Sequence, residues 1–372
     1  MQANTFKRLL CAGAVVFASL SPFVAQAEEK KSFDIAWTIY AGWMPWKYAD
    51  ESGIMKKWAD KYGIEVNITQ VNDYVESINQ YSAGQFDGVV ATSMDALSIP
   101  AAGGIDTTAL IVGDYSNGND GMVMKDSADL RSLAGQQIHL VELSVSHYLL
   151  AQALDSVGMS ERDVQVVNTS DADLVAAFST DEVRNVVTWN PLLDEVAATP
   201  GAHRTFDSSQ IPGHIKDLTI VNSETLADNP DFGKAVVGAW YEVMAILESD
   251  TEEGAKARAS LGQASGTDQA GYESQLKGMK MFWKPADSLA FINSDEAYQA
   301  MDSVRRFSFD HGLLGDGADS VDFIGIAMPG GKLMGSDANV KLRIDTTYMQ
   351  MAADGKLSVS SATARCRTVR SG

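Results

Sequence analysis

The segment GQQIHLVELSVSHYLL, residues 135–150, gives the clearest indication of the fold. Its short apolar run Ile138–Val141 predicts a strand, and the apolar residues after the polar turn recur with helical spacing. Ser144 stands where a helix N-cap belongs, because its hydroxyl group can accept a hydrogen bond from the first turn. A strand that leads directly into a helix N-terminus is typical of parallel α/β sheets, which bind ligands at that end of the strands.

Glu142 occupies the turn between this strand and this helix. The free N–H groups and the dipole of a helix N-terminus favour an anion, so a carboxylate at this position disfavours an anionic ligand. We therefore expect a neutral or cationic ligand at this turn. The alternative is that Glu142 is a solvated or capping acid with no ligand.

The N-terminus predicts an export signal over residues 1–27. Lys7 and Arg8 precede the apolar run Leu9–Leu20, and Ala25-Gln26-Ala27 fits a cleavage site. The apolar run is too short to span a membrane, and no later run is long enough, so we expect an exported protein without stable membrane insertion.

Charge and cysteine content narrow the possible partners and the compartment. The net charge is −20, and removal of Lys7 and Arg8 with the signal makes it −22, which disfavours nucleic acid and anionic membranes as partners. Cys11 would leave with the signal, so Cys366 alone would remain and no intrachain disulfide could form. An exported chain without disulfides suits a bacterial periplasm.

Strands and helices alternate along the chain, which predicts an α/β fold of two doubly wound lobes joined by two crossing segments. With 45% hydrophobic residues among 372, the chain can form two sizeable cores. We expect residues 28–117 and 217–354 to form the first lobe, 118–216 the second, and 355–372 a frayed tail. The expected strands are 33–39, 64–68, 86–91, 109–113, 122–124, 138–141, 164–167, 185–187 and 217–221. The expected helices are 48–62, 73–83, 93–101, 144–157, 171–178, 191–198, 232–247, 254–261, 268–279, 295–311 and 346–351.

Motifs for catalysis and for cofactors are absent from the sequence, which favours a binding protein without a cofactor or metal over an enzyme. The five histidines, at positions 139, 147, 203, 214 and 311, lack zinc-ligand spacing, and no nucleotide-binding or nucleophile motif occurs. A nucleophile–base pairing of Ser144 or Ser146 with His147 is a weaker alternative. Trp43 and Trp46 lie in a loop after the first strand, where they suit either core packing or an aromatic wall that attracts a cation.

Three segments resemble the substrate-binding proteins of ABC importers. They are ATSMDAL at 91–97, VELSVSHYLL at 141–150 and VTWNP at 187–191. The sequence is most similar to the nitrate, sulfonate and taurine class, and within it to the branch associated with urea carboxylase and guanidine breakdown. VELSVSHY and DTTYM at 345–349 are the most specific strings. The wider class often binds anions at the helix N-terminus after residue 143, and this sequence departs from it there with Glu142.

The resemblance implies a monomeric type II periplasmic binding protein that delivers a solute from an interlobe cleft to a membrane permease and its ATPase. The branch implies guanidinium or urea, and the stacking and hydrogen bonding of guanidinium with tryptophan and carboxylate favour the cation. We expect ligand contacts from Trp43, Trp46, Ser93, Asp95, Asp114, Glu142, Ser144, His147, Trp189 and Asn190. The alternatives are an anion binder of the same fold, an enzyme similar to thiamine-pyrimidine synthases, and an exported sensory module.

Overall fold

The computed structural model describes residues 30–357. The predicted signal peptide, Cys366 and most of the predicted tail lie outside these residues. Within the described part of the chain, no helix combines the length and the apolar character that a membrane span needs.

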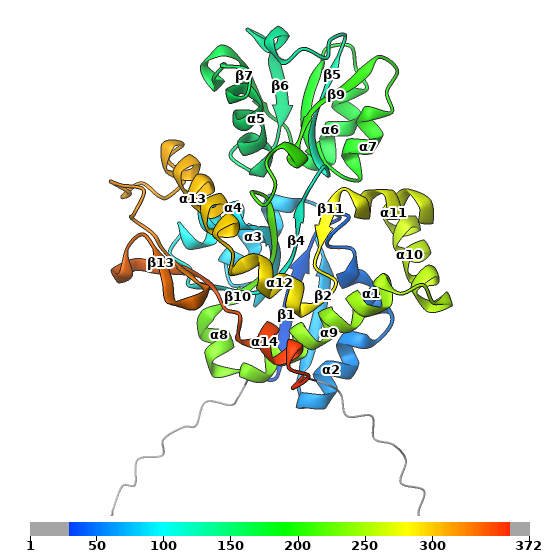
Figure 1. The fold of residues 1–372 in the computed structure, drawn as a ribbon, viewed down its shortest axis with the longest axis vertical. Helices are drawn as coiled ribbons and strands as arrows, with labels where there is room; N and C mark the ends of the chain where they lie inside the picture. The colour runs from blue at the N-terminus through cyan, green and yellow to red at the C-terminus, as the bar shows by residue number, and fades with distance from the viewer. Residues whose placement is uncertain (1–29, 358–372) are drawn as a thin grey trace, which may run out of the picture. The chain divides into compact units, whose positions relative to one another are not determined.

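The larger sheet has nine strands, in the order β13-β12-β14-β4-β10-β3-β1-β2, with β11 paired to β4 (Figure 1). β1 is parallel to β2 and β3, whereas β10 is antiparallel to both β3 and β4, so the sheet is mixed. The strands are β1 Ser32–Trp37, β2 Glu65–Gln70, β3 Gly88–Thr92, β4 Thr107–Ser116, β10 Lys216–Asn222, β11 Met279–Met281, β12 Gly325–Met328, β13 Lys332–Met334 and β14 Val340–Ile344.

The smaller sheet has five strands in the order β7-β6-β8-β5-β9. β6 is parallel to β7 and β8, and β5 is antiparallel to β8 and β9. Its strands are β5 Asp120–Lys125, β6 Gln137–Leu140, β7 Gln165–Asn168, β8 Asn185–Trp189 and β9 Ala202–Asp207. Two sheets with mainly parallel central strands confirm the α/β fold class. We call the part built on the larger sheet lobe 1 and the part built on the smaller sheet lobe 2.

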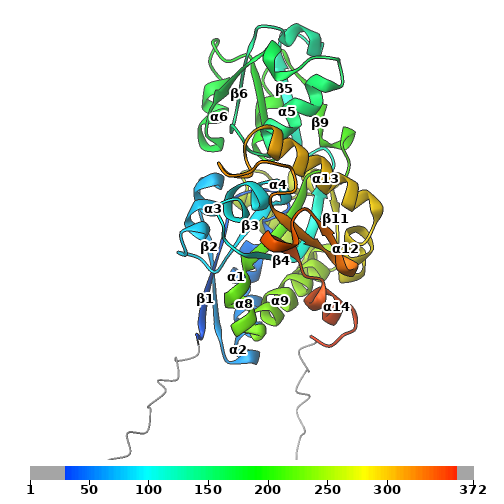
Figure 2. The ribbon, with the colours of Figure 1, turned by 90° about the vertical axis from the view of Figure 1, so that its left-hand side faces the viewer.

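Helices flank both sheets (Figures 1 and 2). Those of lobe 2 are α5 Val145–Asp155, α6 Asp171–Phe178 and α7 Leu192–Ala197. Those of lobe 1 are α1 Pro45–Glu51, α2 Ile54–Tyr62, α3 Tyr74–Ser82, α4 Ser93–Ala96, α8 Ser223–Asp228, α9 Pro230–Glu248, α10 Glu252–Ala264, α11 Gln269–Lys277, α12 Pro285–Ile292, α13 Asp295–Asp310 and α14 Thr347–Ala353.

The structure corrects several sequence-based elements. The single helix expected over 48–62 is two helices, because Gly53 adopts a φ of 76° between them. The strand expected to end at Gly113 continues to Ser116, so Asp114 lies within β4 rather than in a turn. The sequence did not predict β9, β11, α12 or the strands β12 to β14. Both β9 and β13 are short and contain polar residues, which conceals the apolar alternation typical of a strand.

Two crossing segments connect the lobes. The first joins β4 to β5 through residues 117–119, and the second runs from the end of β9 to β10. Hydrogen bonds link them: the hydroxyl groups of Ser116 and Ser208 lie 2.7 Å apart, and Ser208 also accepts from the backbone N–H of Gly118 at 2.7 Å. The two segments are thus joined directly to each other.

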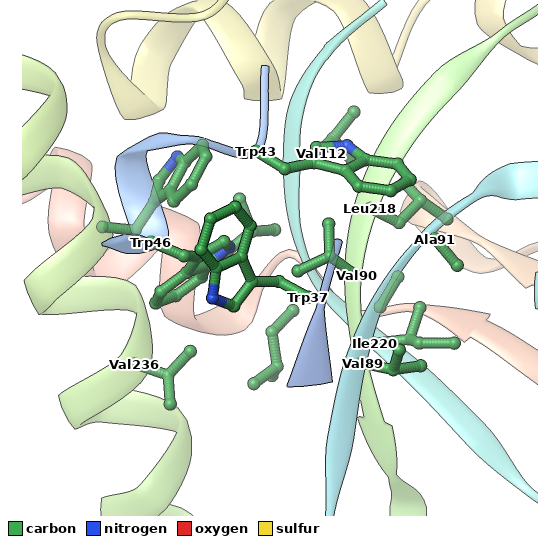
Figure 3. Close-up of a cluster of buried hydrophobic side chains, with 14 of the residues drawn as sticks. Trp37, Trp43, Trp46, Val89, Val90, Ala91, Val112, Leu218, Ile220 and Val236 are labelled. Carbon is green, nitrogen blue, oxygen red and sulfur yellow. The ribbon is translucent and has the colours of Figure 1, made fainter. Parts of the chain in front are cut away.

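The core of lobe 1 lies between the larger sheet and α9, which packs against α2. Tryptophans 37, 43 and 46 and apolar side chains of β3, β4 and β10 fill one contiguous cluster (Figure 3). Phe33 of β1 stacks on Phe232 of α9 with ring centroids 4.4 Å apart. Gly238 of α9 lets the ring of Trp58 approach the helix backbone, because a Cβ there would lie 2.3 Å from the ring.

We therefore expect Gly238→Ala to lower the free energy of unfolding by about 1–3 kcal/mol through overpacking. Urea unfolding of the purified chain measures this change. Gly317→Ala is a suitable control, because the nearest atom, on Phe323, would be 3.7 Å from the new Cβ. Equal stability of Gly238→Ala and the unaltered protein would contradict the described packing of α2 on α9.

Candidate ligand-binding site

A small cavity lies where the two lobes meet. It has a volume of about 10 Å³, close to the smallest that holds one water molecule. Residues of lobe 1 and of the second crossing segment line one side of the cavity, and residues of lobe 2 line the other side. The lining residues are Tyr40, Trp43, Tyr74, Thr92, Asp120, Val145, Trp189, Ile215 and Asp217.

Four aromatic rings form a continuous wall around this cavity. Tyr40 and Trp43 come from the loop after β1, Tyr74 begins α3, and Trp189 ends β8 in lobe 2. Successive ring centroids along this series lie 5.1, 5.3 and 5.5 Å apart. All four rings are buried, so their faces can attract a cation in a site shielded from water.

Asp95 supplies the first of four buried carboxyl groups near the cavity. Its Oδ2 accepts hydrogen bonds from the hydroxyl groups of Tyr74, at 2.7 Å, and Thr92, at 2.9 Å. The backbone N–H of Val145 also lies near enough to Asp95 to lower its pKa. Burial raises the pKa of Asp95 to about 6, while these hydrogen bonds act in the opposite direction. Oδ1 of Asp95 has no hydrogen-bond partner among the described residues.

The contact between Asp95 and Val145 bears directly on the ligand class. Val145 is the first residue of α5, so a carboxyl group of lobe 1 faces the free N–H groups at this helix N-terminus. The N–H group of Val145 is therefore near the protein's own acid, and that of Ser146 donates to the hydroxyl group of Ser144. That leaves less of the helix N-terminus for an anionic ligand.

Asp114, Asp120 and Asp217 form a second group of buried acids. Asp114 and Asp217 are opposite each other in the register of β4 and β10, so their carboxyl groups act on each other, and neither carboxyl oxygen of Asp114 has a hydrogen bond of ordinary geometry. Burial raises the pKa of Asp114 to about 7 and, with the charge of Asp114, raises that of Asp217 as well. Burial also raises the pKa of Asp120 to about 7.

These acids have no ion-pair partner among the described residues, although Arg204 acts on Asp120 from a longer distance. Within residues 30–357, none of the four aspartates forms an ion pair with lysine or arginine, and each has at least one buried carboxyl oxygen without a hydrogen-bond partner. Leaving buried polar atoms unpaired costs about 1–3 kcal/mol each, and more when they are charged. The indole Nε1 of Trp43 and the hydroxyl group of Tyr40 are also unpaired.

A larger cavity of about 670 Å³ also lies between the lobes, lined among others by Gln70, Asp171 and Asp194. The smaller cavity is the better candidate site, because the buried unpaired oxygens and the aromatic rings converge there and not at the larger cavity.

The structure places Glu142 apart from the aromatic cavity. Its side chain is exposed at the surface, and it lines a separate shallow pocket with Asp73 and Glu76 instead of the aromatic cavity. The conformation of this turn does not involve the Glu142 carboxylate. The backbone N–H of Glu142 donates to Asn168 Oδ1 at 3.0 Å, and Leu143 adopts a left-handed backbone conformation with a φ of 61°. The carboxylates at the cavity come from Asp120 and Asp217.

Four further expected residues have other roles. Trp46 is fully buried and packs on Trp240, with ring centroids 5.0 Å apart. Ser144 is confirmed as the N-cap of α5, and its hydroxyl group serves that cap. Asn190 bonds to Asn119 and to the backbone N–H of Asp194. His147 contacts Glu161 away from the cavity.

The remaining expected residues fall at or beside the cavity. Trp43 and Trp189 line it, Asp95 bonds to two lining residues, and Asp114 is opposite the lining residue Asp217 in the register of β4 and β10. Ser93 is buried beside Asp95 with an unpaired hydroxyl group.

Sequence reasoning missed Tyr40, Tyr74, Thr92, Asp120 and Asp217 as site residues. A usable signal existed for the two acids: Asp217 stands near the start of β10, directly before Leu218, and Asp120 is the first residue of β5. A charged residue within a buried strand is rarely found unless it has a partner or a ligand.

The sequence and the fold of this chain are similar to those of known proteins. The model of the NMT1/THI5 like family matches residues 52–246, more than half of the chain. The chain belongs to this family. A search of curated proteins gives no match.

Solved structures share the fold at low sequence identity. The alkanesulfonate-binding protein of Xanthomonas axonopodis pv. citri matches with a TM-score of 0.65 and 17% identity, over 77% of this chain and 96% of that chain. The aliphatic sulphonate binding protein of Escherichia coli matches with 0.62 and 16%, over 76% and 94%. The nitrate-binding protein of Synechocystis PCC 6803 matches with 0.54 and 11%, over 89% and 99%.

The raised pKa of Asp120 predicts a pH-dependent stability. A carboxyl group with a pKa above its ordinary value of 3.8 stabilises the fold while it is protonated, and this contribution is lost as the pH rises through about 7. We expect Asp120→Asn, which removes the charge, to raise the melting temperature at about pH 8 and to have a smaller effect at about pH 5.

Thermal unfolding at both pH values measures this effect. Asp155→Asn is the matched control, because Asp155 is exposed at the end of α5. A loss of stability of equal size at both pH values would show that Asp120 is not a buried carboxyl group of the kind described.

Proposed function

We propose that this chain is the periplasmic solute-binding component of an ABC importer and that it captures a small nitrogen-rich cation of the guanidinium type between its lobes. The observation that carries this proposal is the set of four buried aspartates beside an aromatic wall, which have no ion-pair partner within residues 30–357. The fold shared with solute-binding proteins supports transport as the setting.

The chemistry of guanidinium fits these groups. Its rim of N–H groups donates in the plane of the ion, which suits carboxyl oxygens of Asp120 and Asp217 that have no other donor. Its flat faces suit the rings of Trp43 and Trp189. The cavity, with room for about one water molecule, leaves no space for an alkyl chain, and a guanidinium ion would require its lining side chains to move apart.

Ligand-dependent closure follows from the same charges. Closing the lobes without a ligand buries carboxylates, at a cost of several kcal/mol when they are ionised and unpaired. A bound cation offsets this cost in the closed form only, so it shifts the population toward closure. The permease would then recognise the closed form and receive the solute.

Two other ligands are alternatives. Urea has similar donors but no charge, so it would leave the carboxylates uncompensated. An anion such as a sulfonate or nitrate is suggested by the names of the similar solved structures. Buried carboxyl groups without lysine or arginine partners argue against an anion, since like charges repel in a site of low dielectric.

Calorimetric titration of the mature protein tests the ligand class. We expect guanidinium to bind with one ion per chain, and urea, nitrate and taurine to bind weakly or not at all. Guanidinium binding should weaken as ionic strength rises, whereas urea binding would not. Nitrate or taurine binding more tightly than guanidinium would overturn the proposal. Recovery of the ligand unchanged would argue against an enzyme.

Asp120→Asn tests the site itself. It should weaken guanidinium binding by about tenfold or more, because a charge-assisted hydrogen bond is lost in a buried site. Glu142→Gln is the matched control, since the exposed Glu142 lies outside the cavity. If Glu142→Gln weakened binding and Asp120→Asn did not, the ligand would lie at the turn before α5.

Binding should also depend on pH. The pKa values of Asp114 and Asp120, raised to about 7, mean that both carboxyl groups gain protons as the pH falls below neutrality. We therefore expect guanidinium affinity to rise from about pH 5 to pH 8 and binding near neutrality to release protons. Calorimetry in two buffers with different ionisation enthalpies detects that release. A flat pH profile would show that these carboxyl groups do not hold the ligand.

A further inference from the structure

A second cluster of polar groups lies outside the aromatic cavity. His147, Glu161 and His311 each present one ligand atom, and these atoms lie within 4.8 Å of one another. Nε2 of His311 and Oε2 of Glu161 are 2.6 Å apart, and Nε2 of His147 contacts Oε1 of Glu161. One carboxylate thus stands between two imidazole rings.

The three residues come from both lobes. His147 lies on α5 and Glu161 begins a short 3₁₀ helix, Glu161–Asp163, in lobe 2. His311 is the C-cap residue of α13, which belongs to lobe 1 and contacts α5 through Phe307 and Tyr148. The cluster therefore assembles only where α13 contacts lobe 2.

Packing around the cluster is tight and aromatic. Phe307 of α13 stacks on His311 with ring centroids 3.9 Å apart, and it meets Tyr148 of α5 edge to face at 5.1 Å. His147 is 5% exposed, so its Nε2 is shielded from bulk water. This nitrogen contacts Oε1 of Glu161 but forms no hydrogen bond of ordinary geometry. A buried imidazole nitrogen aimed at a carboxylate and a second imidazole is a typical arrangement of metal ligands.

We propose that His147, Glu161 and His311 bind a divalent transition metal ion, with zinc as the best fit, and that this ion ties α5 of lobe 2 to α13 of lobe 1. Two imidazoles and one carboxylate are a known zinc donor set, in which water takes the fourth tetrahedral position. Imidazole ligands select such metals over calcium or magnesium, which prefer oxygen ligands.

His311 is oriented for this role by its other ring nitrogen. Nδ1 lies 2.9 Å from the backbone carbonyl oxygen of Phe307 and donates to it. Such a hydrogen bond from the far nitrogen is the usual support of a metal-bound histidine. Without a metal, Nε2 also carries a proton, because it lies 2.6 Å from a carboxylate oxygen of Glu161, and a metal ion bound at Nε2 would replace that proton, which is released to water.

His147 needs one local change. Its Nδ1 accepts a hydrogen bond from the backbone N–H of Leu143 at 3.1 Å, which places the proton of the neutral ring on Nε2. Metal binding through Nε2 moves that proton to Nδ1 and breaks this bond. Leu143 is 42% exposed, so water can then accept from its N–H group.

The test is a titration of the tag-free mature protein, first treated with a chelator, with ZnCl₂ by calorimetry and with CoCl₂ by visible absorption. We expect one ion per chain and the strong visible absorption of a tetrahedral cobalt site. His311→Ala and Glu161→Gln should each weaken zinc binding by about tenfold or more. Zinc should also raise the melting temperature of the unaltered protein, because it binds the folded state.

His203→Ala is the matched control, since His203 is an exposed histidine of β9, and it should bind zinc like the unaltered protein. Circular dichroism without metal shows whether each variant is folded. Absence of zinc binding, or equal binding by folded His311→Ala and Glu161→Gln, would overturn the proposal. The test is independent of the solute, because it uses no guanidinium.

Discussion

Burial of carboxyl groups without an ion-pair partner among the described residues is the constraint on which the interlobe site depends. Asp95, Asp114, Asp120 and Asp217 are each almost inaccessible to water, and burial raises the pKa of every one of them. Apolar residues at these four positions could be buried at a lower cost in free energy. The retention of acids in such a position is understandable if a positively charged solute completes the site.

Three of the buried acids lie where the chain crosses between the lobes. Asp114 and Asp217 lie on β4 and β10, next to the segments that cross between the lobes, and Asp120 begins β5 just beyond the first crossing. The proton or cation that neutralises them is thus held at the hinge itself. Electrostatic repulsion among the three carboxylates acts where a small change of backbone angle moves a whole lobe.

Much of the fold was predictable from local pattern. Apolar runs followed by capped helices identify β1, β3 and β6, and Ser144 was correctly assigned as a cap, because these signals need only a few neighbouring residues. Short polar strands such as β9 carry no such signal, since they are recognised only by their partner β5. The antiparallel direction of β10 likewise follows from pairing between distant segments.

The site was predictable only in part, because a sequence shows residue types but not which way their side chains point. Glu142 was placed correctly in the turn before α5, yet its side chain faces solvent. Asp95, taken mainly as a dipole-compensating residue of its own short helix, also faces the start of α5. His147, Glu161 and His311 lie far apart in sequence, so their convergence could not be inferred from spacing.

The hydroxyl group of Ser208 contacts both Ser116 and the backbone of Gly118, so the two strands that connect the lobes are fastened to each other at mid-span. Two ribbons joined in this way cannot bend separately or slide past each other without breaking those bonds. Each of these bonds contributes about 0.5–1.5 kcal/mol net, so separate bending of the two segments costs about that much free energy. Motions that carry both segments together keep the bonds and are favoured.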